Sequence, residues 1–176
     1  MEIVKYKITG VCPILMHNIN SMLLKKPRAT SHEDWEVSEP FMRAKSYLEG
    51  DKFILPPRLF FGLLKAAAKR SGIKQPGKRS SYEQILKSVV FITDGMNLNS
   101  KFEDHEKEQA FVTVNKSKVL RCWPKLNEWS GIIEITNADT KALPTEVLTE
   151  LLEFSGRFVG LGDYRPSFGR FKVEKI

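Results

Sequence analysis

The sequence predicts an α+β fold of the ferredoxin-like (RRM-like) βαββαβ type, with extra strands and a long insertion after the first strand. Two observations support this prediction. The first is the order of elements along the 176 residues: strand, long excursion, helix, several strands, helix, glycine-rich loop and strand. The second is that two segments carry apolar residues at helical spacing, whereas the other apolar segments are short and β-branched or alternating. We expect a single domain over residues 1–176, interrupted by an irregular insertion at about 18–51.

The first strand is predicted over residues 2–9, where side chains alternate in character. Gly10 ends it, and Pro13 lacks the N–H that further ladder pairing would need. From Asn18 to Asp51 no periodicity remains, and apolar residues are scattered among charged ones. Loops of this length in small domains are usually functional or partly disordered. We therefore expect an irregular segment that packs on this domain, on a nucleic acid or on a neighbouring subunit.

The first long helix is predicted to follow a short strand over residues 52–55. Pro56-Pro57 opens it, because the missing N–H of a proline is unpaired in a first turn anyway, and Gly72 ends it. From Lys52 to Tyr82 the chain has no acidic residue but has eight basic ones: Lys52, Arg58, Lys65, Lys69, Arg70, Lys74, Lys78 and Arg79. We expect this segment to contact nucleic acid, the alternative being a solvated helix face with a flexible basic loop.

The C-terminal half is predicted to consist mostly of strands. A short helix over residues 80–87, capped by Ser80 or Ser81, precedes them. The strands lie over residues 88–93, 110–115, 118–123, 128–137 and 170–176. The polar segment 101–108 is expected to be exposed. A last helix over residues 144–154 has apolar residues at helical spacing, and Gly156 is predicted to stop it.

The composition favours an anionic partner, because the formal net charge is +7 and the isoelectric point is about 9.4. No apolar run approaches the ~18 residues that span a bilayer, and the N-terminus lacks the layout of a secretory signal. We therefore expect a cytoplasmic protein without a membrane partner. Cys12 and Cys122 are far apart, and P-loop, GxSxG and dinucleotide-binding motifs are absent. We expect no metal and no cofactor.

A segment rich in glycine and arginine, GRFVGLGDYRPSFGRF at residues 156–171, lies between the last predicted helix and the last strand. Glycine allows positive φ angles and close approach of backbones, and the flat charged fork of arginine suits phosphate. Such a loop is chemically suited to hold a sugar-phosphate backbone. A helix stop and a tight turn with solvated arginines is the alternative interpretation.

The basic segment and this loop together supply the candidate nucleic-acid-binding residues. The candidate backbone contacts are Arg58, Lys65, Lys69, Arg70, Arg157, Gly160, Gly162, Arg165 and Arg170. The loop that carries Lys74, Lys78 and Arg79 is a candidate flexible clamp. The candidate stacking residues are Tyr164, Phe168 and Trp123, and for Phe168 and Trp123 core packing is an equal alternative.

Three stretches of the sequence resemble the RAMP superfamily of CRISPR-associated proteins and phage-encoded relatives of it. GLGDYRPSFGRF at residues 160–171 is similar to the glycine-rich loop between the last helix and last strand of their ferredoxin-like domain. YKITGVCPILMHN at 6–18 is similar to their first strand and its following turn. FILPPRLFFGLLKAAA at 53–68 is similar to the step into their first helix. The resemblance implies binding of RNA or another single-stranded nucleic acid, often by subunits stacked along the strand.

We expect a non-enzymatic protein that binds single-stranded RNA or DNA and coats it, either as a homo-oligomer or as a subunit of a ribonucleoprotein complex. The first alternative is a metal-independent endoribonuclease, since some RAMP proteins use a histidine as general acid or base on a 2′-hydroxyl. His17 follows the first strand, where such a histidine would lie, and a hydrogen-bonded loop histidine is its other interpretation. The second alternative is a basic protein-interaction module that acts as an inhibitor or decoy of a nucleic-acid-binding complex.

Overall fold

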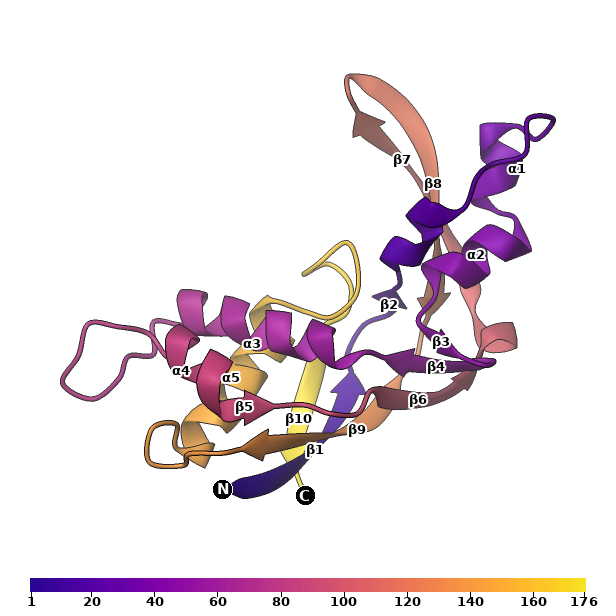
Figure 1. Cartoon of the computed structure of the whole chain (residues 1–176). Helices are drawn as coiled ribbons and strands as arrows, with labels where there is room; N and C mark the ends of the chain where they lie inside the picture. The colour runs from indigo at the N-terminus through magenta and orange to yellow at the C-terminus, as the bar shows by residue number, and fades with distance from the viewer.

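A four-stranded antiparallel sheet with two long helices on one face forms the body of the molecule (Figure 1). The computed structural model describes all residues from Met1 to Ile176. The elements of the body are β1 (Glu2–Gly10), α3 (Pro57–Arg70), β5 (Val90–Phe91), β9 (Ser130–Asn137), α5 (Thr145–Phe158) and β10 (Phe171–Lys175). Their order across the sheet is β10-β1-β9-β5. This is a ferredoxin-like βαββαβ arrangement, so the predicted fold class is confirmed.

The alternation of side chains in β1 determines which face of this sheet is buried. Val4, Tyr6 and Ile8 are at most 2% exposed, while the residues between them face solvent. Tyr6 pairs with Ile133 and Val4 with Ile135 of β9, so both strands bury the same face. The apolar faces of the two helices complete this core with Phe60, Leu63, Leu64, Ala67, Leu148, Leu151 and Leu152.

A second sheet projects from the body as an arm (Figure 1). Its strands, in spatial order, are β2 (Ile14–Leu15), β8 (Ser117–Leu126) and β7 (Glu106–Val114). Asn115 and Lys116 join β7 to β8 with φ angles of 49° and 67°, the left-handed conformation that two-residue hairpin turns favour. The predicted hairpin is confirmed, with longer strands than expected. The prediction that pairing stops at Pro13 was wrong, because β2 begins at the next residue.

A third, smaller sheet joins the body to the base of the arm. Its strands are β3 (Leu48–Glu49), β4 (Lys52–Leu55) and β6 (Met96–Lys101), and the short 3₁₀ helix η2 (Phe102–Asp104) follows β6. The sequence predicted β4 but not β6, because MNLNSK contains few residues that favour strands. Most of the segment 101–108 is exposed, as expected, but Phe102 is buried and β7 begins at Glu106.

About half of the insertion after β1 is helical, which corrects the expectation of an irregular segment. It contains the 3₁₀ helix η1 (Ile19–Leu23) and the helices α1 (His32–Glu36) and α2 (Glu39–Lys45). A buried ion pair fixes α1 and α2 to the arm: Lys45 Nζ lies 2.6 Å from Glu36 Oε2 and donates to the carbonyl of Cys122 at 2.6 Å. Burial opposes ionisation of Glu36, but Lys45, the Cys122 N–H and Arg121 hold its pKa below the ordinary value.

Two predicted helix boundaries were wrong. Gly156 does not stop the last helix but lies inside α5, which ends at Phe158. A Cβ at Gly156 would overlap the carbonyl oxygen of Phe171, so this glycine is required for the close packing of α5 on β10. The short helix α4 (Glu83–Val89) begins later than predicted and shortens the strand expected over 88–93 to β5. No helix of the structure has both the length and the apolar character to cross a bilayer.

The two helix-interior glycines provide a matched test of this packing. We predict that Gly156→Ala lowers the free energy of unfolding by about 1–3 kcal/mol, the usual cost of overpacking. Gly62→Ala in α3 should instead raise it by up to about 1 kcal/mol, because a Cβ there meets no atom within 4 Å. Urea unfolding followed by circular dichroism measures both. Equal effects of the two substitutions would show that close packing at Gly156 is unimportant.

Candidate functional site

The carboxylate of Asp163, in the loop after α5, connects three parts of the chain that are far apart in sequence. Its Oδ2 accepts hydrogen bonds from Nδ1 of His17 at 3.2 Å and from Nε1 of Trp123 at 2.8 Å. Its Oδ1 accepts from the backbone N–H of Tyr164 at 2.9 Å. The hydrogen bond with His17 is the main reason that the pKa of Asp163 falls to about 2, although partial burial opposes this shift. Asp163 is therefore ionised at neutral pH and can only accept hydrogen bonds.

This geometry fixes the tautomer of His17. Because the Asp163 carboxylate can only accept, Nδ1 of His17 carries the proton in this bond, and in the neutral imidazole Nε2 then has the lone pair. His17 Nε2 makes no hydrogen bond within the protein, and the His17 side chain is 40% exposed. The imidazole is thus held in one orientation with its second nitrogen accessible from outside.

Arg58, in the first turn of α3, contacts Asn18, the residue that follows His17. Its Nη2 donates to Oδ1 of Asn18 at 3.4 Å, and its guanidinium carbon lies 5.7 Å from the centre of the Tyr47 ring. The hydroxyl of Tyr47 donates to the carbonyl of His17 at 3.1 Å. Burial raises the pKa of this hydroxyl, so Tyr47 stays neutral and positions the chain at His17. The insertion, through Tyr47, thereby supports the same site.

Three of the predicted contact residues, Arg58, Arg70 and Arg165, line one groove of about 400 Å³ between α3 and the loop after α5. We call this the arginine groove; its other lining residues are Leu59, Gly62, Ala66, Val159 and Pro166. No acidic residue lines it. Arg58 and Arg70 are twelve residues apart on one helix, which places them about 18 Å apart along its axis. The groove therefore presents three permanent positive charges along an extended path.

The glycines of this loop are explained by the fold. Gly160, Gly162 and Gly169 have φ angles of 75° to 80°. A Cβ at Gly162 would overlap the carbonyl oxygen of Leu15, and one at Gly169 that of Leu161. Most backbone N–H groups of the loop are already bonded within the protein, among them those of Gly160, Leu161, Asp163, Phe168 and Gly169. Direct phosphate contact by Gly160 and Gly162 stays a prediction, and the side chains are what the loop presents outward.

Tyr164 is the accessible aromatic residue of the site. It is 51% exposed, has a φ angle of 54°, and packs edge-on against Trp123 and Phe168 with ring centres 5.6 and 6.3 Å away. Trp123 is 5% exposed and bonded to Asp163, so its core-packing interpretation fits the structure. Phe168 is half-buried. A stacked base would therefore meet Tyr164 first.

The other basic candidates of the first segment lie outside the arginine groove. Lys65 is half-buried on α3, and Lys69 is 3.4 Å from Glu83 of α4. The loop with Lys74, Lys78 and Arg79 is exposed and extends beyond the C-terminal end of α3, at the left in Figure 1. Its role as a clamp stays a prediction.

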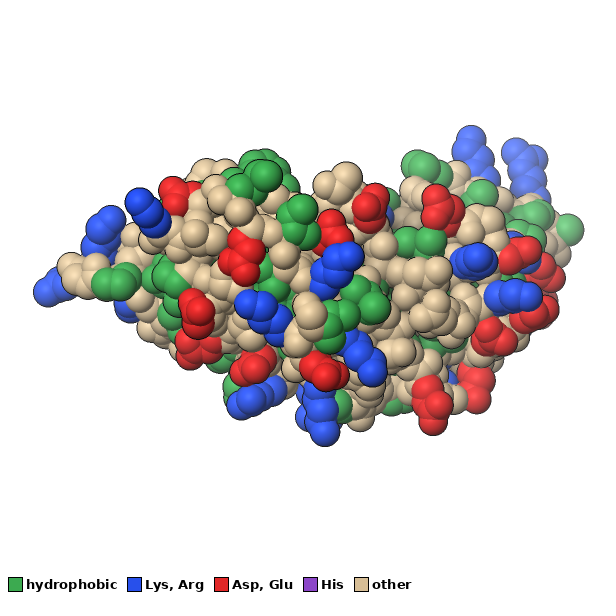
Figure 2. Space-filling model, turned by 90° about the horizontal axis from the view of Figure 1, so that it is seen from below, with side chains coloured by type: hydrophobic (Ala, Val, Ile, Leu, Met, Phe, Trp, Pro, Cys, Tyr) green, Lys and Arg blue, Asp and Glu red, His purple; other side chains and the backbone are tan.

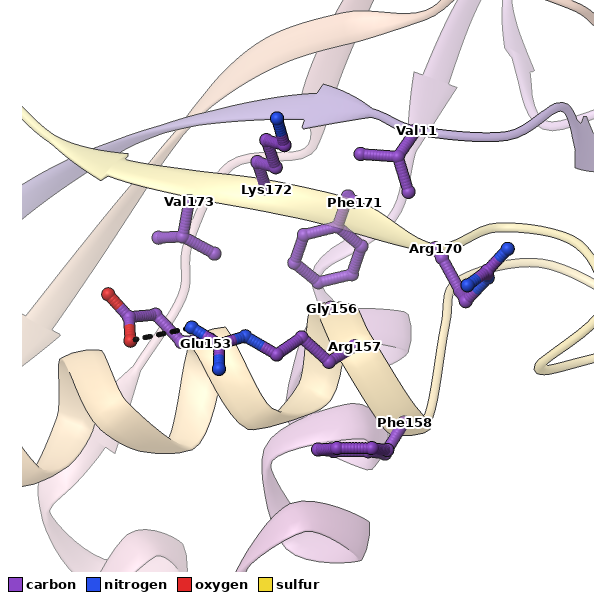
Figure 3. Close-up of a pocket in the computed structure, with 9 residues that line it drawn as sticks. All are labelled: Val11, Glu153, Gly156, Arg157, Phe158, Arg170, Phe171, Lys172 and Val173. Carbon is purple, nitrogen blue, oxygen red and sulfur yellow. Dashed lines mark ion pairs between the residues drawn. The ribbon is translucent and has the colours of Figure 1, made fainter.

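Arg157 and Arg170 line a different pocket, of about 550 Å³, between α5 and β10 (Figure 3). Figure 3 shows the guanidinium of Arg157 turned toward Glu153, 3.8 Å away, with Phe171 and Val173 in the wall of the pocket. The structure thus divides the predicted arginines between two surfaces. Helix α5 and the loop after it separate Arg157 and Arg170 from the arginine groove.

The solvent-facing side of the four-stranded sheet has a different charge pattern from the arginine groove. Figure 2 shows basic and acidic side chains interspersed on this face of the molecule. Lys5 and Glu134, for example, are 3.2 Å apart across β1 and β9. Ile3 and Ile132 are exposed there, and aromatic side chains are limited to Phe91 at the β5 edge. A polyanion meets less uniform attraction on this face than in the arginine groove.

Sequence reasoning missed Asp163, Tyr47 and Asn18. Asp163 had a detectable signal, because it is the only acidic residue between Glu153 and Glu174, in the midst of arginines. Tyr47 and Asn18 had none, since their roles depend on how the insertion folds back on β2. No group of three or more His, Cys, Asp or Glu side chains has an arrangement that suits a metal ion.

No protein-family model and no curated protein sequence matches this chain. Solved structures do match: one is a chain of the structure described as "Cryo-EM structure of the Type III-B Cmr-beta bound to cognate target RNA". The TM-score is 0.58 at 11% sequence identity, over 99% of this chain and 60% of the other. The present chain therefore spans about three fifths of the length of its neighbour. The likeness shows a shared fold and supports the ferredoxin-like arrangement expected from the sequence.

The role of Asp163 can be tested through the pH dependence of stability. Folding lowers the pKa of Asp163 from 3.8 to about 2, so its contribution is fully present above about pH 4 and is lost as the pH falls toward 2. We predict that Asp163→Asn lowers the free energy of unfolding at pH 7 by about 1–2 kcal/mol. This is at the low end for hydrogen bonds to charged groups, because the Asp163 side chain is 38% exposed and water screens the interaction. The difference from the wild type should shrink between pH 4 and pH 2 in urea titrations. A difference that is independent of pH would contradict this role.

Proposed function

We propose that the protein binds single-stranded RNA as a subunit of a ribonucleoprotein complex. The observation that carries this proposal is the arginine groove, which Arg58 and Arg70 of α3 line together with Arg165 of the loop after α5, and which has no acidic residue in its wall. Arginine forks match phosphate geometry, and they stay charged at any physiological pH. The groove is extended along α3, as a strand backbone requires. Tyr164 stands exposed in the same loop as Arg165 and offers a platform for a base.

The structural neighbour favours RNA over DNA as the ligand. That neighbour belongs to an assembly whose description states that it is bound to cognate target RNA. At 11% identity the likeness extends to the fold, so its ligand supports the proposal without deciding it. We also propose that several copies of this chain bind side by side along the strand and coat it. The net charge of +7 is in keeping with either single strand.

The proposal predicts that removal of the three groove arginines weakens binding and flattens its salt dependence. The variant Arg58→Ala/Arg70→Ala/Arg165→Ala should bind a single-stranded RNA at least about tenfold more weakly at moderate salt. The slope of log K against log salt should fall by about 2, since each phosphate contact contributes about 0.7 on single strands. Fluorescence anisotropy with a labelled oligonucleotide, repeated at four salt concentrations, measures both quantities.

The matched control removes three exposed lysines from the outer face of the sheet, in the variant Lys5→Ala/Lys7→Ala/Lys172→Ala. It changes the net charge by the same amount and should leave the affinity within about threefold. Equal losses for both variants would show only a non-specific charge effect. No binding by the wild type to RNA, single-stranded DNA or duplex would direct the search to an acidic protein partner.

A second candidate function is metal-independent cleavage of the bound RNA, and the orientation of His17 favours it. Asp163 holds Nδ1–H, so Nε2 is free to take a proton from a ribose 2′-hydroxyl. The 2′-oxygen would then attack the adjacent phosphorus, and the bond to the 5′-oxygen of the next nucleotide would break. That oxygen takes a proton from water, which leaves a 2′,3′-cyclic phosphate and a 5′-hydroxyl. Arg58, which contacts Asn18 directly after His17, would stabilise the charge that develops on the phosphate.

This candidate predicts slow RNA cleavage that persists in EDTA and stops in His17→Ala. At saturating RNA the substitution should lower the cleavage rate by about 10²-fold or more, the usual contribution of a general base. Replacing the 2′-hydroxyl at the cleaved position by hydrogen should also stop the reaction. Intact RNA after prolonged incubation with wild-type protein would eliminate this candidate and leave the binding proposal in place.

A further inference from the structure

The insertion and β8 enclose a pocket of about 450 Å³ that adjoins the candidate site. We call it the insertion pocket. His17 lines the insertion pocket and is also hydrogen-bonded to Asp163, so the pocket and the site around Asp163 share this residue. The remaining walls come from η1, α1, α2 and β8, elements that Figure 1 shows side by side at the base of the arm. Its volume falls in the range of pockets that hold small ligands.

The charged residues of this pocket favour an anion. Lys26 of the insertion and Arg121 of β8 both line it, together with His32. The one carboxylate in its wall is Glu36, whose side chain is 1% exposed. Both oxygens of Glu36 are already engaged, one by Arg121 at 2.9 Å and the other by Lys45 at 2.6 Å. A negatively charged group that enters the pocket therefore meets positive charge with little repulsion from Glu36.

The apolar residues of the pocket present surface that is otherwise uncovered. Met22 is 77% exposed and Leu24 is 42% exposed, and both line the pocket. Trp35 of α1 is half-buried there and stacks on Phe41 with ring centres 5.1 Å apart, which holds its indole in place. Met22, Leu24 and Trp35 thus form one apolar surface that a bound group would cover, as contiguous exposed apolar patches often do at binding sites.

We infer that the insertion pocket binds one nucleotide of the same strand that the arginine groove holds, an inference that rests on the proposed function. The base packs on Trp35, Met22 and Leu24, and the phosphate lies near Lys26 and Arg121. Single-strand binding sites combine basic grooves with aromatic and apolar platforms in this way. The strand path runs from Arg70 past Arg58 and His17 into the insertion, so His17 lies beneath the phosphate that joins the two sites.

The apolar residues of η1, together with Leu24, which directly follows it, offer a matched pair of variants. Met22→Ser/Leu24→Ser removes two side chains that line the pocket, whereas Ile19→Ser/Leu23→Ser removes two that do not. Ile19 and Leu23 are 64% and 78% exposed, so the control changes a comparable apolar surface in the same segment. We expect the first variant to bind single-stranded RNA about tenfold more weakly, the usual effect of losing one stacked base. The control should bind within about twofold of the wild type.

Photocrosslinking locates the base directly. Oligonucleotides that carry 5-iodouridine at one position at a time are irradiated in complex with the full chain, and the attached peptides are identified by mass spectrometry. The expected result is a crosslink to Trp35 or to the segment 22–26 from a single position, lost in Met22→Ser/Leu24→Ser and kept in the control. Crosslinks confined to Tyr164 and α3, with unchanged affinity of Met22→Ser/Leu24→Ser, would overturn the inference while the arginine groove retained its role.

Two further outcomes separate this inference from the proposed function. If the wild type binds no nucleic acid, both fail together. In the second outcome, the wild type binds RNA and both variants bind RNA as well as it does. If both variants also lose a protein that the wild type captures, the apolar surface formed by Ile19, Met22, Leu23 and Leu24 is a protein-docking site. That result overturns the nucleotide pocket alone.

Discussion

The hydrogen bonds to the Asp163 carboxylate are the interaction on which the candidate site depends. They connect the chain after β1 through His17, the arm through Trp123, and the loop after α5 through the N–H of Tyr164. A partly buried carboxylate is costly unless its oxygens are satisfied, so these three partners are held in one arrangement. The positions of Arg165 and Tyr164 follow from that arrangement, because both lie within two residues of Asp163 in the same loop.

The net charge of +7 is distributed unequally over the surface of the molecule, and this distribution determines where a polyanion is attracted. On the outer face of the sheet, basic and acidic side chains alternate and partly neutralise each other (Figure 2). Arg58, Arg70 and Arg165 line a groove between α3 and the loop after α5 that has no acidic residue in its wall. The nearby Asp163 carboxylate is engaged by His17 and Trp123. In the insertion, the buried carboxylate of Glu36 is neutralised by ion pairs with Lys45 and Arg121. A polyanion is therefore attracted to one side of the molecule.

The sequence predicted the elements whose formation depends on local pattern. Helices α3 and α5 have strong apolar periodicity, and β1, β8 and β9 have residues that favour strands. The helices of the insertion escaped prediction because they are five and seven residues long and depend on contact with β8. Gly156 was misread because a glycine near a helix end usually signals a stop, whereas here it allows β10 to pack closely.

The candidate site was predicted in part for the same reason. The basic residues and the loop were visible in the sequence, and Arg58 and Arg70 share a helix whose extent was predicted correctly. Their convergence with Arg165, and the separation of Arg157 and Arg170 onto another surface, follow from how α5 packs and where its loop turns back toward β2. Contacts of that kind join distant segments, so no local pattern records them.

Backbone amide NMR of the labelled protein, titrated with a short single-stranded RNA, tests the central claim most directly. The account predicts that shift changes concentrate along α3 from Arg58 to Arg70, at His17 and in the loop from Val159 to Pro166, and that they weaken as salt is raised. Changes confined to the outer face of the sheet around Lys5, with the arginine groove unaffected, would contradict it.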